Sequence, residues 1–369
     1  MMKTVRMLRT GFHPVLDGLF EPVRQRFSES PQYDLLGDDS TEQADVTLAF
    51  LPDGDDIDQL GIERRTYQDF VGIFFIGEPA ESDAQRVVRS YEIGLRCMAN
   101  LAGYTEVTGN GPRDYRMTLI TPERGHELLE GSDDASEWLF NLLLQRSDVT
   151  YIDENIVHAD LAEELRQGTE VTRKMQEMAR RLDDLDLVPS AVALDGLSDR
   201  ARRRFFKVLG QKQVSYGNMS ARHNDEVFWM TGRGVDKAKL DVIGKDILLV
   251  SKFAPDAHEV HVTVPPGFED SRVSIDSSIH AAIYREFPEI GAMIHIHWFV
   301  DGIVYTDEHY PCGTIELCES TLDGLKATED PGHTILGLTN HGIIVTGADL
   351  EDCWGQIEAK LPALEAAGS

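Results

Sequence analysis

Two histidines stand two residues apart in the apolar segment MIHIHWF, residues 293–299. On a β-strand His295 and His297 would point to the same side, because side chains alternate along a strand. Imidazole is a good ligand for zinc and other first-row divalent ions, and a catalytic centre commonly takes three protein ligands. Such a pair also occurs in hydrogen-bonded cores, so the interpretation depends on a third ligand.

The late segment TNHGIIVTG, residues 339–347, offers a candidate third ligand. His341 stands at a turn expected between two strands, and Gly342 permits a tight or left-handed backbone that would hold the ring at a strand end. The three histidines can share one ion only if the fold brings these segments together.

The elements around these residues read as strands with helices between them. EVFWMTG, DILLVS and EVHVTVP have strand patterns, SSIHAAIYREFP has a helical pattern, and HTILGLTNHGIIVTG is typical of a strand, a turn and a strand. We expect residues 191–369 to form a central, mainly antiparallel sheet flanked by helices.

The first 150 residues alternate strand and helix patterns instead. Buried strands at ADVTLAFL and VGIFFIGE favour an α/β domain with a Rossmann-like parallel sheet in residues 1–150. No GxGxxG follows the first strand, so dinucleotide binding has no support. Residues 151–190 are rich in charge and have helical periodicity, and we interpret them as a helical connector.

The composition narrows the class of protein. A chain of 369 residues with 41% hydrophobic residues can form two globular domains. Its formal net charge of −29 opposes binding to nucleic acid or anionic membranes. No apolar run approaches the length of a membrane helix, the start lacks a signal-peptide pattern, and the four cysteines form no CxxC pair. We therefore expect a cytoplasmic protein.

Several motifs of the second part follow one another in an order that resembles the class II aldolase/adducin family, from residue 196 to residue 354. They are a glycine-asparagine loop, a Thr-Gly loop, a carboxylate four residues before a helical histidine, HxH, and a late NHG. In this sequence they read YGNMSAR (216–222), MTGRGVDKAKL (230–240), VSIDSSIHAAIYREFPEIGAMIHIH (273–297) and LTNHGIIVTGADLEDCW (338–354).

The resemblance implies that His295, His297 and His341 bind a divalent metal ion, with zinc expected and manganese, iron or cobalt as alternatives. The ion would act as a Lewis acid on an enediolate formed when a proton is lost or a carbon–carbon bond breaks. Asp276 stands where related aldolases have an acid/base glutamate and related epimerases an aspartate. It is expected to move protons or ligate the metal, although its position also suits a helix N-cap.

The resemblance also implies phosphate binding by small loops of the same domain. Their residues are Gly217, Asn218, Thr231, Gly232 and Ser274. The family's Ser-Ser pair is Ser274-Ile275 here, which removes one hydroxyl. Arg222, Arg233 and Lys237 either compensate for that loss or are surface charges, so the substrate could carry a phosphate, a carboxylate or no anion.

The family's proton donor is a tyrosine from the C-terminal part of the chain, but no tyrosine follows Tyr310. Glu316 is the expected replacement, with Tyr305, Tyr310 and Glu319 as alternatives. Cys312 and Cys318 flank Glu316, and we interpret them as packing residues, with a soft-ligand role as the alternative.

These patterns predict a metal-dependent lyase for retro-aldol cleavage or decarboxylation of a small hydroxy or keto acid or sugar derivative. A sugar-phosphate 4-epimerase or a dehydratase on the same scaffold is the alternative, since fold similarity does not separate these reactions. An adducin-like, non-catalytic interaction module ranks below both, because adducins lack the metal histidines. The resemblance further implies a homo-oligomer, a tetramer with sites at subunit interfaces, acting on a small-molecule substrate.

Overall fold

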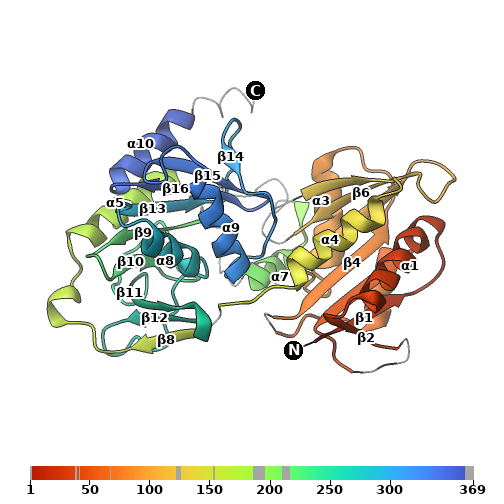
Figure 1. Ribbon diagram of the computed structural model, residues 1–369, viewed down its shortest axis with the longest axis horizontal. Coiled ribbons are helices and arrows are strands. Elements are labelled where there is room, and N and C mark those ends of the chain that lie inside the picture. The colour runs from red at the N-terminus through yellow and green to blue at the C-terminus, as the bar shows by residue number, and fades with distance from the viewer. Residues whose placement is uncertain are drawn as a thin grey trace. The chain divides into compact units, whose positions relative to one another are not determined.

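A computed structural model of the protein describes residues 2–37, 40, 42–66, 68–121, 126–152, 154–185, 196–209 and 217–361 (Figure 1). Contacts divide the chain into two compact units. The first contains Met1–Asp148 and Ser190–Leu209, and the second contains Val149–Pro189 and Gly210–Ser369. Among the residues described, no helix is long and apolar enough to cross a membrane.

The first unit is built on one sheet. Its strands are β1 (Lys3–Arg9), β2 (Tyr33–Leu35), β3 (Val46–Leu51), β4 (Phe70–Ile76), β5 (Leu101–Val107), β6 (Tyr115–Ile120) and β7 (His126–Glu130). Its helices are α1 (Pro14–Glu29), the 3₁₀ turn η1 (Gly54–Asp56), α2 (Ile57–Leu60), α3 (Asp83–Gly94), α4 (Ala135–Ser147) and α7 (Asp199–Leu209).

The strand order of this sheet is β2-β1-β3-β4-β5-β6-β7. The strands from β2 to β5 are parallel, as predicted, whereas β6 and β7 continue the sheet as antiparallel strands. The parallel part has the order 2-1-3-4-5, which flavodoxin-like sheets share, and not the 3-2-1-4-5-6 order of dinucleotide-binding folds. The predicted Rossmann-like arrangement is therefore not confirmed.

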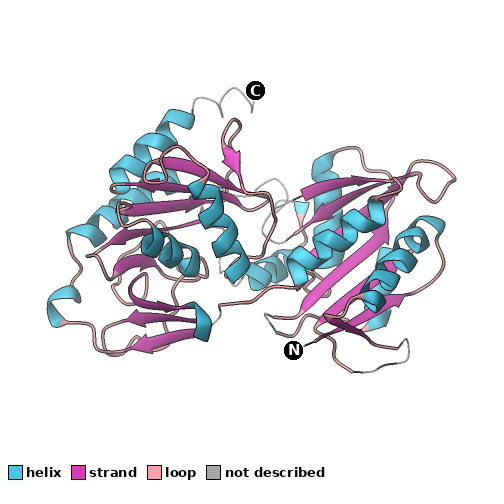
Figure 2. Cartoon of the chain, in the orientation of Figure 1, coloured by secondary structure: helices cyan, strands magenta, loops and turns pink. Residues whose placement is uncertain are grey.

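Helices cover both faces of this sheet (Figure 2). Val46, Leu48 and Phe50 of β3 pack with α1 and α4, whereas Ala49 and Leu51 belong to a separate cluster on the other face. This cover on two sides explains why all six residues of β3 are buried.

The second unit is built on a larger sheet. Its strands are β8 (Glu154–His158), β9 (Gly217–Arg222), β10 (Phe228–Thr231), β11 (Ile247–Ala254), β12 (Glu259–Thr263), β13 (Ala292–Ile296), β14 (Val304–Tyr305), β15 (Thr334–Leu338) and β16 (Gly342–Gly347). Its helices are η2 (Glu163–Leu165), α5 (Glu170–Asp184), η3 (Pro255–Ala257), α8 (Ser277–Glu286), α9 (Ile315–Lys326) and α10 (Leu350–Lys360).

The strand order is β14-β15-β16-β13-β9-β10-β11-β12-β8, and only the two edge pairs are parallel. The predicted mainly antiparallel sheet with flanking helices is confirmed for this unit. Ile294 and Ile296 of β13 pack with α5 and α10, whereas Met293 packs with α8 and α9. Because side chains alternate, His295 faces the α8/α9 side.

The segment predicted as a helical connector contains the strand β8 and the helix α5. Residues 154–158, expected in a helical connector, form β8 because they pair with the edge strand β12, and this pairing outweighs their weak strand propensity. Helix α5 has the predicted helical periodicity, and its apolar face buries Met175 and Met178 in the core of the second unit.

Helix α7 belongs to the first unit, although it lies within residues 191–369, the range predicted for the second domain. The N–H of Ser198 donates to Glu92 (2.7 Å), and Arg204 donates to the carbonyls of Leu95 and Arg96 (3.1 and 2.8 Å). The boundary predicted near residue 190 lies outside the described residues. The division into residues 1–150, 151–190 and 191–369 stays a prediction.

The backbones of both neighbouring strands approach β13 closely at glycines. Gly217 of β9 has φ +141°, and a Cβ there would lie 2.0 Å from the carbonyl oxygen of His295. Gly342 of β16 has φ +151°, and a Cβ there would lie 2.3 Å from the carbonyl oxygen of Ile296. Side chains rarely tolerate such φ values or such contacts. The glycines of the GN and HG motifs are therefore required by the backbone itself.

Gly342→Ala is expected to lower the free energy of unfolding by about 1–3 kcal/mol, the usual cost of a strained backbone position. Urea unfolding measures this change. Gly355→Ala in α10 is the matched control, because nothing lies within 4 Å of its Cβ position and alanine favours a helix by about 1 kcal/mol over glycine. Equal stabilities of the two variants would contradict the role given to Gly342.

Candidate metal centre

The three histidines of the HxH and NHG motifs lie together. The ring centroid of His295 is 4.9 Å from that of His297 and 4.7 Å from that of His341, and the last two are 5.5 Å apart. One ligand nitrogen from each ring lies within 4.8 Å of the others. Asn340, with φ +55°, and Gly342 turn the chain between β15 and β16 and so bring His341 to β13.

The residues present fit a divalent cation. Nδ1 of His295 lies 2.9 Å from the carbonyl oxygen of Ile343, so Nδ1 carries the hydrogen and Nε2 carries the lone pair. This Nε2 is buried and has no hydrogen-bond partner among the described residues. A buried acceptor left unpaired is costly, and a cation on Nε2 would relieve that cost. The ligand role of the three histidines itself stays a prediction.

Burial keeps the imidazoles uncharged. It is the main cause that lowers the pKa of His295. It also lowers the pKa of His297 well below the usual value, and the neighbouring His295 and His341 lower it further. Neutral imidazole is the form that binds metal. His295 and His297 are therefore in their ligand form at neutral pH.

Helix α8 lies over β9 through two side-chain hydrogen bonds. Asn218 donates from Nδ2 to Oδ2 of Asp276 (2.7 Å), and Ser220 bonds Nδ1 of His280 (2.7 Å). Two residues along a strand advance about 6.8 Å, and four residues along a helix advance about 6 Å. The spacing of the two polar side chains on β9 is therefore similar to the spacing of their two partners on α8. Asp276 occupies the N-cap position but makes no capping hydrogen bond. Its carboxylate is therefore turned to Asn218.

A buried hydrogen-bonded chain fixes the orientation of His280. The hydroxyl of Tyr284 lies 2.9 Å from Oγ of Ser220, which bonds Nδ1 of His280. If Tyr284 donates to Ser220 and Ser220 to Nδ1, both hydroxyl hydrogens are used and Nε2 of His280 carries a hydrogen. The reverse direction leaves the Tyr284 hydrogen without an acceptor among the described residues. Burial lowers the pKa of His280 to about 3, so this imidazole stays neutral.

Lys237 is a buried cation near the same cluster. Its ammonium donates to the carbonyl oxygen of Gly217, the residue before Asn218. Burial lowers its pKa to about 8, although the charge of Asp276 acts in the opposite direction. The surface-charge interpretation of Lys237 is therefore wrong, and its ammonium lies within electrostatic range of Asp276.

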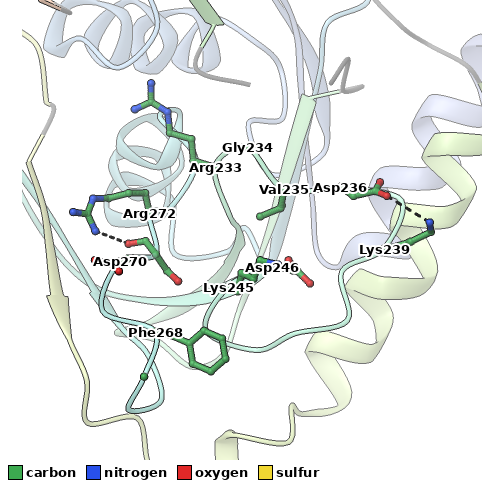
Figure 3. Close-up of a pocket in the computed structure, with 12 residues that line it drawn as sticks. Arg233, Gly234, Val235, Asp236, Lys239, Lys245, Asp246, Phe268, Asp270 and Arg272 are labelled. Atoms are coloured by element: carbon green, nitrogen blue, oxygen red, sulfur yellow. Dashed lines mark hydrogen bonds and ion pairs between the residues drawn. The ribbon is translucent and has the colours of Figure 1, made fainter. Parts of the chain in front are cut away.

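The segments predicted to bind phosphate pair with each other. The N–H of Ser274 donates to the carbonyl oxygen of Thr231 (3.1 Å), Gly232 forms a bridge with Val273, and the N–H of Arg233 donates to Arg272 (2.8 Å). Beyond this pair lies a cavity of about 720 Å³ (Figure 3). Charged side chains of both signs line it, namely Arg233, Asp236, Lys239, Lys245, Asp246, Asp270 and Arg272. Anion binding by Gly217, Asn218, Thr231, Gly232 and Ser274 stays a prediction.

Two other candidate residues, Glu316 and Arg222, form hydrogen bonds with the backbone. Both carboxylate oxygens of Glu316, in the first turn of α9, accept the N–H of Thr150 (3.1 and 2.9 Å). Arg222 donates to the carbonyls of Tyr284 and Phe287 (2.7 and 3.2 Å) at the end of α8. The structure therefore brings Asp276, but not Glu316, to the histidines, and the acid/base role of Glu316 stays a prediction.

Two residues at this cluster were given no catalytic role from the sequence. His280 entered only as a motif position, and Cys312 was interpreted as a packing residue with a soft-ligand role as the alternative. Sγ of Cys312 lies 3.2 Å from Nε2 of His341, so packing alone does not describe it. The only signals were the D-x-x-x-H spacing and the position of Cys312 between the HxH and NHG motifs.

The sheet with its flanking helices and the cluster of three histidines define the second unit as an α/β domain with a candidate divalent-metal centre. Residues 200–300 match the family model described as Class II Aldolase and Adducin N-terminal domain. This part of the chain is similar to the class II aldolase/adducin family, the family that its motifs resemble.

Curated relatives match about a quarter of the chain. The methylthioribulose-1-phosphate dehydratase of Microcystis aeruginosa is 35% identical over 100 residues, which cover 26% of this chain and 42% of the relative. The protein of the same name from an Enterobacter species is 33% identical over 94 residues, 26% of this chain and 40% of the relative. The chain thus spans about two fifths of the length of these relatives.

Solved structures of aldolases are more distant. An L-fuculose 1-phosphate aldolase is 15% identical, with a TM-score of 0.35 over 56% of this chain and 91% of that one. A sugar-phosphate aldolase from Thermotoga maritima is 14% identical, with a TM-score of 0.37 over 53% of this chain and 93% of that one.

His297→Ala is expected to lose most of the bound metal without unfolding the second unit, because the variant removes one ligand from a set of three. Elemental analysis of the purified, tag-free protein measures metal per chain, and circular dichroism checks the fold. His333→Ala is the control, since His333 is exposed and pairs with Asp352. Full metal retention in His297→Ala would contradict the ligand assignment.

Lys237→Met is expected to change how stability depends on pH. The pKa of Lys237 rises from about 8 in the folded chain to about 10.5 in the unfolded chain. The unfolded state then binds more protons between these values, so folding becomes more favourable as pH rises. The unfolding free energy of the wild type, relative to Lys237→Met, should rise by about 3 kcal/mol from pH 8 to 10.5.

Denaturant unfolding of metal-free protein at several pH values measures this difference. Lys245→Met is the matched control, because it makes the same replacement at an exposed lysine. If the difference in unfolding free energy between the wild type and Lys237→Met stays constant across this pH range, the prediction of a lowered pKa for Lys237 is wrong.

Proposed function

We propose that residues 217–361 form a divalent-metal-dependent lyase that removes water from a small hydroxy ketone or related sugar derivative. One observation carries the proposal. Nε2 of His295 and Oδ1 of Asp276 are both buried at the cluster and have no hydrogen-bond partner among the described residues. The first is a ligand atom and the second a base. The curated relatives, named as dehydratases, support dehydration as the reaction type.

Dehydration of a hydroxy ketone breaks a C–H bond beside the carbonyl and the C–O bond of the neighbouring hydroxyl. A cation held by His295, His297 and His341 supplies stabilisation of the negative charge that develops on the carbonyl oxygen. Asp276 takes the proton from carbon through Oδ1, while Asn218 holds Oδ2. Lys237, near Asp276, gives the proton with which the hydroxyl leaves as water.

Retro-aldol cleavage is the second candidate, because the matching family model is that of the class II aldolases. It breaks a carbon–carbon bond but develops charge on the same oxygen, so the same residues would serve it. Decarboxylation, 4-epimerisation and assembly as a homotetramer stay predictions. Zinc is the expected ion, with manganese, iron and cobalt as the alternatives.

Asp276→Asn is expected to lower kcat/KM by about 10²–10⁴-fold, the range for loss of a general acid or base. Metal content and unfolding should be unchanged, because the replacement has the same shape. Glu316→Gln is the comparison variant, since its amide oxygen can still accept the Thr150 N–H, and we expect nearly normal kcat/KM. Full activity of Asp276→Asn would overturn the assignment, and a similar loss in Glu316→Gln would restore Glu316 as a catalytic residue.

The assay uses metal-loaded, tag-free protein with phosphorylated and unphosphorylated hydroxy ketones. Mass spectrometry separates a product that has lost water from the two fragments of a retro-aldol cleavage. Fragments would put the aldolase reaction first. A chain that binds no metal and converts no substrate would indicate an adducin-like interaction module.

A further inference from the structure

Cys312 lies at the histidine cluster. Its Sγ is 3.2 Å from Nε2 and 3.9 Å from Nδ1 of His341. One ligand atom each from Asp276, Cys312 and His341 lies within 4.8 Å of the other two. His341 therefore belongs both to this group and to the group of three histidines.

The loop around Cys312 is held on both sides. Thr314 donates from its hydroxyl to the carbonyl of Pro311 (2.8 Å) and caps α9 by accepting the N–H of Leu317 (3.2 Å). Gly313, with φ +74°, accepts the N–H of Ile152 (2.8 Å). A Cβ on Gly313 would lie 2.5 Å from Ile275, the residue before Asp276. The thiol is thus presented by a fixed backbone that packs beside the carboxylate.

The distance suits two ligands of one ion. Zinc binds sulfur at about 2.3 Å and imidazole nitrogen at about 2.0–2.1 Å, which puts the two ligand atoms about 3.1–3.6 Å apart for bond angles of about 90–110°. The 3.2 Å from Cys312 to His341 falls in this range. The unpartnered Nε2 of His295 points to the same need for a cation.

We propose that Cys312 is a thiolate ligand of the ion held by His295, His297 and His341. The inference rests on the metal centre of the proposed function and adds a sulfur ligand to it. A donor set of three imidazoles and one thiolate favours zinc or cobalt over manganese, because soft ligands select softer ions. A substrate oxygen would then need a fifth coordination position, which zinc can provide.

Cobalt titration of the full-length, metal-free protein tests the proposal. A thiolate ligand gives a charge-transfer band in the near ultraviolet, which histidine ligands alone do not give. We expect this band in the wild type, its loss in Cys312→Ser, and at least about a tenfold weaker affinity for cobalt in that variant, since even outer partners of a ligand are worth that much. Cys318→Ala is the control, because burial raises the pKa of that thiol to about 12 and the band should remain.

The outcomes separate this proposal from the proposed function. Visible cobalt bands without the charge-transfer band would leave the metal centre standing and overturn the role of Cys312. Failure of the wild type to bind cobalt would overturn both. If Cys312→Ser does not fold, X-ray absorption of the zinc-loaded wild type decides, because one sulfur at about 2.3 Å is expected and a first shell of nitrogen and oxygen alone would refute the ligand.

Discussion

The C-terminal end of β13, which holds His295, lies between two strands that each have a glycine at this point. At Gly217 and Gly342 any side chain would meet the β13 backbone. Without these close approaches, β9 and β16 could not pair with β13 up to Ile296. The positions of Asn218 and His341 follow from the same pairing, since each is the chain neighbour of one of these glycines. The site is therefore built from backbone spacing before any side chain contributes.

Burial then sets the charge state of the site. The imidazoles of His280 and His295 remain neutral because solvation of a cation is lost inside the unit. Lys237 keeps part of its affinity for protons because Asp276 is near. A pocket of neutral nitrogens with one carboxylate and one weakened ammonium suits a divalent ion and a proton transfer. The same burial would be unfavourable in the absence of a cation, since Nε2 of His295 has no protein partner among the described residues.

Local patterns predicted much of this unit. The HxH strand, the helix after Asp276 and the strand, turn and strand around His341 follow from period and turn residues, which are encoded within a few positions. Strand β8 was missed because its pairing partner β12 lies about a hundred residues further along the chain. The sequence left alternatives open for Cys312 and Lys237, since their places depend on a loop that Ile152 contacts and on the carbonyl of Gly217. In the first unit, the alternation of strand and helix patterns predicted a parallel sheet. It did not predict the strand order or the antiparallel pairing of β6 and β7.

Two side-chain pairs join helix α8 to β9 on the face of the sheet that this helix covers. Asp276 and His280 stand four residues apart on that helix and meet Asn218 and Ser220, two residues apart on β9. Among the residues that the structure describes, Oδ1 of Asp276 and Nε2 of His280 have no hydrogen-bond partner. With the Tyr284–Ser220 chain fixing its hydrogen on Nε2, His280 is a neutral N–H donor, which can polarise a substrate oxygen without giving up a full charge. Under the proposed function, a base, a hydrogen-bond donor and a cation site would thus lie on the face of the sheet that α8 covers.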